Sequence, residues 1–154
     1  MGEFETFDDV RAGVLGIFLE ALPEHPIREV EAAEVEPGRY IVVLAMDTCW
    51  LRILLNLGDV ELAVGGEGAP LTFADAVGGE RVWFPIQPMI ARVVNSDEVD
   101  GDRIFFMSTT DKLRLFAGWL GLSLEGWSSV NCWCAEAISY IQAVLSPLET
   151  DELQ

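Results

Sequence analysis

Cysteine and histidine are the residue types from which nucleophiles and metal ligands would be drawn, and this sequence has three cysteines and one histidine. Cys132 and Cys134 fall in a predicted helix, where their side chains would point about 200° apart, so they cannot ligate one ion or bond to each other. Cys49 and His25 add no second pair at the short spacing that structural zinc requires. We therefore predict packing cysteines, a solvated loop histidine, no metal site and no cofactor.

Two other segments resemble ligand sites only in part. In the acidic turn Ser96–Asp102, aligning Gly101 with the glycine of a calcium loop places Met107 where the bidentate glutamate should stand. A looser divalent site at this turn stays open. The glycines of Gly65–Gly68 have neither dinucleotide-binding spacing nor the Lys-Ser/Thr of a phosphate loop, and no serine lies in a Gly-x-Ser-x-Gly setting. We propose no catalytic residue and expect that the protein is not an enzyme.

Charge is the dominant feature of the composition, because 26 acidic residues face nine basic ones and give a formal net charge of −17. Such a charge repels nucleic acid and speeds encounter with an oppositely charged surface. We expect a partner protein with a basic surface and no direct binding of nucleic acid. Acidity that serves only solubility or high-salt adaptation is the alternative.

Carboxylates and tryptophans supply the candidate contacts with such a partner. Trp127 lies in a connector rather than in a predicted element and is the first aromatic anchor. Core filling is the alternative for every tryptophan. A homodimer would bury part of the large apolar set that a mean hydropathy of +0.30 indicates. The candidate binding residues are Trp127, Trp119, Glu29, Glu31, Glu34 and Glu36.

The first element that positions these residues is a helix. Apolar residues recur at steps of three and four from Phe7 to Leu22, and Thr6 and Asp9 form a variant of the capping box. Pro23 ends the helix.

An antiparallel sheet follows, and a β-bulge near Ala32 and Ala33 would restore the alternation of its first strand. The segment Gly65–Pro88 is predicted as a loop-rich insertion or mobile segment, with a short helix over Phe73–Val77. The predicted strands cover residues 28 to 36, 39 to 46, 49 to 57, 60 to 64, 82 to 94 and 103 to 107.

Two helices close the chain. The first begins at the hydroxyl-acid cap Ser108–Asp111 and ends before Gly121. The second covers about Asn131–Ser146 and is terminated by Pro147.

The chain is predicted to be one cytoplasmic domain covering residues 1–154, with no membrane contact. Tyr40–Leu57 is apolar, but Asp47 and Arg52 near its middle would be costly in lipid, so it is predicted to be core. Met1–Glu5 carries acids where a signal peptide needs positive charge.

The order of these elements resembles the type III secretion chaperone-like fold, including the Tir-chaperone and YbjN-type domains of bacteria. Trp119-Leu120-Gly121 and Asn131-Cys132-Trp133 are similar to the aromatic C-terminal pattern of such domains. The resemblance implies a small, acidic, often dimeric protein that holds other polypeptides. No family site carries over residue by residue, and Gly65–Pro88 has no counterpart.

We thus predict an α+β fold in which an antiparallel sheet is packed mainly on one face by an N-terminal helix and two C-terminal helices. The predicted function is that of a non-enzymatic acidic binding protein, meaning a chaperone, an immunity protein or an inhibitor. The alternatives are a nucleic-acid mimic that inhibits a DNA-binding protein, and a small-molecule-binding domain with a deep apolar pocket.

Overall fold

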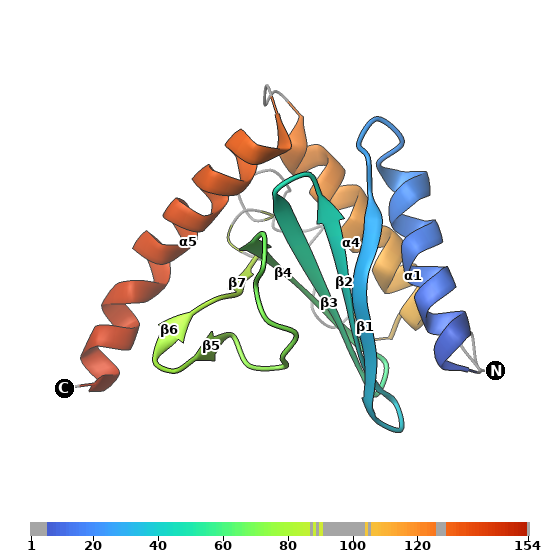
Figure 1. Ribbon diagram of the computed structural model, residues 1–154, viewed down its shortest axis with the longest axis horizontal. Coiled ribbons are helices and arrows are strands. Elements are labelled where there is room, and N and C mark those ends of the chain that lie inside the picture. Colours follow the sequence, from blue (N-terminus) through green and yellow to red (C-terminus); the bar gives the residue numbers. More distant parts are fainter. Residues whose placement is uncertain are drawn as a thin grey trace.

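The computed structural model describes residues 6–86, 88, 90, 104, 106–125 and 129–153, which form the predicted α+β fold (Figure 1). An N-terminal helix precedes the strands, and two long helices follow them. The elements are α1 (Phe7–Ala21), β1 (Arg28–Glu36), β2 (Arg39–Met46), β3 (Cys49–Asn56), β4 (Asp59–Gly66), β5 (Ala76–Val77), β6 (Glu80–Arg81), β7 (Phe84–Pro85), α4 (Thr109–Leu124) and α5 (Val130–Leu153).

The main sheet is antiparallel, with strand order β1-β2-β3-β4-β7. Strands β1 to β4 form a meander with tight turns, and the Leu57-Gly58 turn between β3 and β4 has positive φ at both residues, 53° and 95°. Such a turn matches the right-handed twist of the flanking strands. Because β1 pairs with β2 alone in this order, its outer side is an edge of the sheet.

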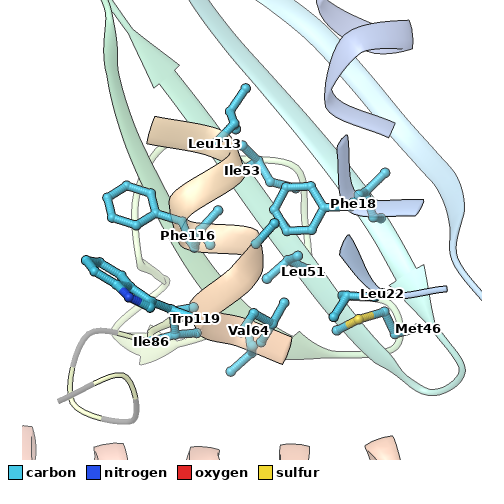
Figure 2. Packing of buried hydrophobic residues seen from close by; sticks show 14 of the residues in the cluster. Phe18, Leu22, Met46, Leu51, Ile53, Val64, Ile86, Leu113, Phe116 and Trp119 are labelled. Atoms are coloured by element: carbon cyan, nitrogen blue, oxygen red, sulfur yellow. The ribbon is translucent and has the colours of Figure 1, made fainter. Parts of the chain in front are cut away.

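One face of the sheet is covered by helices α1, α4 and α5, which form the larger hydrophobic core. Figure 2 shows Phe18 of α1, Leu51 of β3 and Leu113 of α4 among the side chains of this core. Every second residue of β2 and β3 contributes, because side chains alternate across a strand. The prediction that the helices pack mainly on one face is confirmed.

The opposite face carries a smaller core, which the segment 67–83 covers instead of a helix. Ile41, Val43 and Leu54 pack there against Trp83, whose indole N–H donates to the Pro70 carbonyl at 2.8 Å. The predicted loop-rich segment Gly65–Pro88 therefore contains the residues that cover a second hydrophobic layer.

Several predicted elements differ in the structure. Among the described residues of the predicted strand 82–94, only Phe84–Pro85 pairs with β4, whereas Ile90 is helical and its N–H donates to the Ile86 carbonyl at 3.0 Å. Ile104 is helical too, so the predicted strand 103–107 is also wrong at its described residues. Short apolar runs do not reveal their period, which is why these predictions failed. The rest of both segments and the acidic turn Ser96–Asp102 lie outside the described residues.

The predicted bulge near Ala32 and Ala33 is replaced by two register shifts, at Val30 and Val35. With this arrangement Val30 reaches the smaller core while Ala32 packs against the larger one. A single shift at the alanines would not place both side chains in this way, because each added residue changes the face of all that follow.

Three predictions of helix position are also corrected. Phe73–Val77 is not a helix: Ala76–Val77 pairs with Glu80–Arg81 as a two-stranded hairpin around Gly78 and Gly79, which have positive φ. Helix α4 continues through Gly121 to Leu124, and α5 continues through Pro147 to Leu153. Glycine and proline weaken or bend a helix without always ending it, so neither residue marks the boundary.

Candidate protein-binding surface

The predicted glutamates lie on β1, but two of them already have partners in this chain. Arg11 of α1 binds Glu29 with both its Nε and Nη2 atoms, the shorter contact being 2.6 Å. Hydrogen bonding to this carboxylate, together with its charge, raises the pKa of Arg11. Glu36 accepts from Arg39 Nη1 at 3.1 Å. Arginines of the same chain thus partly neutralise both carboxylates.

Glu31 and Glu34 are the two predicted glutamates that remain available. Both are exposed, and among the described residues neither forms an ion pair. Glu31 stands opposite Val43 and Glu34 opposite Tyr40, so they project to opposite faces of the sheet along its edge. The edge strand β1 consequently offers carboxylates on both sides of one backbone.

The basic residues of the described chain are almost all engaged inside the protein. Each described arginine or lysine except Arg28 forms an ion pair with a carboxylate of the same chain. The pairs are Arg11–Glu29, Arg39–Glu36, Arg52–Asp75, Arg81–Asp75, Lys112–Asp59 and Arg114–Asp111. The excess of acidic residues over basic ones is therefore left without internal counter-charge.

The described tryptophans lie mostly in the cores. Trp119 is only 4% exposed and packs against Phe116, with ring centroids 5.5 Å apart, so it presents almost no surface to a partner. Trp133 is fully buried and donates from Nε1 to Ser123 Oγ at 2.9 Å. Trp127, the first predicted anchor, lies outside the described residues. Trp119 is therefore a core residue, which was the alternative to an interface role for every tryptophan.

A hollow that sequence reasoning missed lies between the ends of α1 and α4. Its volume is about 470 Å³, and Glu24, His25 and Glu125 contribute to its lining. The sequence signal was Gly118-x-x-Gly121, since two glycines three positions apart on one helix face allow a neighbouring helix to approach closely. This feature combines negative charge with a concave shape.

The cysteines have different environments, as expected for residues on different sides of a helix. Cys132 is exposed, whereas Cys134 is buried against Cys49 of β3. The hydrogen bond with the Cys134 sulfur, and then burial, raise the pKa of Cys49. Within the described part of the chain, no group of three histidine, cysteine, aspartate or glutamate residues is arranged to hold a metal ion.

Comparisons with protein-family models, curated proteins and solved structures found no match for this chain. The resemblance to secretion chaperones therefore stays a prediction. In the described segments, no helix is both long and apolar enough to cross a bilayer.

Proposed function

We propose that this chain is a non-enzymatic acidic binding protein of the cytoplasm, acting as a chaperone, immunity protein or inhibitor, that docks a basic surface of another protein. One observation carries the proposal. Every described arginine and lysine except Arg28 forms an ion pair within the chain, while Glu31 and Glu34 stay exposed on an edge strand. A complementary basic surface would supply the missing counter-charge and accelerate encounter.

The edge of β1 suits a basic partner better than a second copy of this chain. Two copies paired through β1 would place the exposed glutamates of both edges along one shared strand pair, and like charges across a strand pair are destabilising. The register shifts at Val30 and Val35 also interrupt the regular hydrogen-bonding edge that strand addition needs. Contacts from basic side chains therefore fit this surface better than backbone pairing.

The test measures binding of a fluorescent oligolysine peptide to the full chain and to two charge-matched double variants. Glu31→Gln/Glu34→Gln removes the β1 carboxylates, whereas Glu80→Gln/Glu136→Gln removes two other exposed carboxylates, on β6 and α5. We expect the β1 variant to lose several-fold more affinity than the control. Equal losses would mean that only the overall charge acts, and would contradict the assignment to β1.

Salt dependence tests the electrostatic part separately. Raising the ionic strength from about 0.1 M to about 1 M shortens the Debye length from about 10 Å to about 3 Å and should abolish most of the binding. Capture from lysate with the wild type and with Glu31→Gln/Glu34→Gln then identifies the natural partner as the protein that only the wild type retains. A partner retained equally by both proteins at high salt would refute the proposal.

A further inference from the structure

Helices α1 and α4 run parallel, so they end at the same end of the sheet. At their starts, Phe7 stacks on Tyr40 with ring centroids 6.1 Å apart, and Thr109 donates to the Gly58 carbonyl at 3.4 Å. Both contacts lie at the end of the sheet that carries the β1–β2 and β3–β4 turns. At the other end, a Cβ atom placed on Gly121 would lie 3.2 Å from the Leu22 side chain. The two C-termini are therefore neighbours.

This arrangement concentrates negative charge. The last carbonyl groups of a helix have no partner within it, and the C-terminus carries a partial negative charge of about half an elementary charge. Neither helix has a basic residue in its last turn. Glu24 and Glu125 add carboxylates at the same place, and the described residues around the hollow include no arginine or lysine. Two like helix ends are thus brought together, and His25 is the one basic side chain in the described lining.

The hollow between these helix ends has the shape of a side-chain receptor. Gly118 and Gly121 form part of its wall on α4, and a Cβ atom added to Gly118 would meet nothing within 4 Å. Leu22 and Leu122 give the wall an apolar component, and Leu122 is 46% exposed. Its volume of about 470 Å³ admits a long side chain but is small for a folded segment.

We propose that this hollow receives an arginine side chain of the partner protein, an inference that rests on the proposed function and names one of its contacts. A guanidinium group offers five planar donors, which suit a site lined by two carboxylates, those of Glu24 and Glu125. A guanidinium group is more weakly hydrated than an ammonium group, so it loses less hydration free energy when it enters a partly enclosed site. The apolar stem of arginine would lie against Leu122.

The test fills the hollow without disturbing the fold. Gly118→Gln places a neutral side chain in the open space, and Gly16→Gln is the matched control on α1, where an added Cβ atom also meets nothing within 4 Å. Both changes replace glycine in a helix by a better helix former, so both proteins should fold. Binding of acetyl-Gly-Arg-Gly-amide is followed by NMR shifts of the backbone amides, with the neutral citrulline peptide as the ligand control.

We expect the arginine peptide to shift the amides of Gly121, Leu122 and Glu125, and the citrulline peptide to leave them unchanged. Gly118→Gln should weaken binding at least about tenfold, as expected for loss of charge-assisted hydrogen bonds, and Gly16→Gln should not weaken it. Glu24→Gln/Glu125→Gln should weaken binding several-fold without filling the space.

Three results would overturn the inference: equal binding to Gly118→Gln and wild type, equal binding of the citrulline peptide, or absence of shifts at these amides. A lysine peptide that binds as tightly would overturn the choice of arginine. The oligolysine assay on Glu31→Gln/Glu34→Gln is independent of the hollow. A β1 effect without an effect of Gly118→Gln would thus reject the hollow alone, and absence of both would reject the proposed function as well.

Discussion

Arg52 on β3 and Asp75 in the covering segment form the ion pair that fastens residues 67–83 to the sheet. Arg52 Nη2 lies 2.6 Å from Asp75 Oδ1, and Arg52 Nη1 donates to the carbonyls of Ala74 and Thr72 at 3.1 and 3.3 Å. The Arg52 side chain is 3% exposed and that of Asp75 38% exposed. A charged residue within an apolar strand is thereby the attachment point of the second hydrophobic layer.

Asp75→Asn should destabilise the protein by about 2 kcal/mol. Removing one partner of a fully buried pair costs about 3–5 kcal/mol, and the partial exposure of Asp75 lowers this figure. Urea unfolding gives the free energy. The control Glu36→Gln, which removes an exposed partner of Arg39, should cost less than about 1 kcal/mol. Equal losses of unfolding free energy in the two variants would show that the Arg52–Asp75 pair stabilises the protein no more than an exposed ion pair does.

Gly65→Ala should destabilise the protein by about 2 kcal/mol, because overpacking forces its neighbours to move. A Cβ atom at Gly65 would lie 2.9 Å from the Val82 carbonyl oxygen and 3.0 Å from the Trp83 ring. The next residue is a matched control, since a Cβ atom at Gly66 meets nothing within 4 Å. Gly66→Ala should change the free energy of unfolding by less than about 0.5 kcal/mol. Similar values for both alanine variants in urea unfolding would contradict the close approach at Gly65.

Iodoacetamide should modify Cys132 in the native protein and spare Cys49 and Cys134 until urea unfolds the chain. Cys132 is exposed and the other two are buried. The thiolate is the reactive form; the raised pKa of Cys49 keeps its thiol protonated, whereas the hydrogen bond with Cys49 lowers the pKa of Cys134, so that Cys134 is protected by its burial. Mass spectrometry of peptides locates the label. Native labelling of Cys49 at the rate of Cys132 would show that α5 does not stay packed on β3.

Thr6→Ala should lower the free energy of unfolding by about 1 kcal/mol, the usual cost of losing a helix N-cap. The Thr6 hydroxyl accepts from the Asp9 N–H at 3.1 Å, and the Asp9 carboxylate accepts from the Thr6 N–H at 3.2 Å. Thr6→Ser retains the hydroxyl and should remain close to wild type. If both variants lose the same free energy in urea, the hydroxyl is not what stabilises α1.

The elements predicted well from sequence are those that depend on local chemistry. The capping box at Thr6 and Asp9 and the Ser108 cap each begin a helix where expected. The predicted strands 28 to 36, 39 to 46 and 49 to 57 also form, the last ending at Asn56, and they pair in the expected antiparallel sheet. The residues that specify these elements lie close together in the sequence, so their effect does not depend on how the elements pack.

The candidate contacts were harder to predict, because their availability depends on residues distant in sequence. Glu29 and Glu31 look alike in the sequence, but Arg11 of α1 reaches only Glu29. Tryptophan is a residue type that often anchors protein interfaces, but the packing of α4 on the sheet buries Trp119. Local sequence cannot separate a buried aromatic residue from an exposed one when both stand on an amphipathic helix.

By itself, the sequence determined the net charge, the caps and the periodicities that define an acidic α+β protein, since these are properties of residue types and of spacing along one chain. Only the tertiary structure decided which carboxylates stay unpaired on β1, that residues 67–83 cover the second face of the sheet, and that α1 and α4 end side by side around a hollow. These features arise from contacts between segments far apart in the sequence, and such contacts form only when several elements bury their apolar faces together.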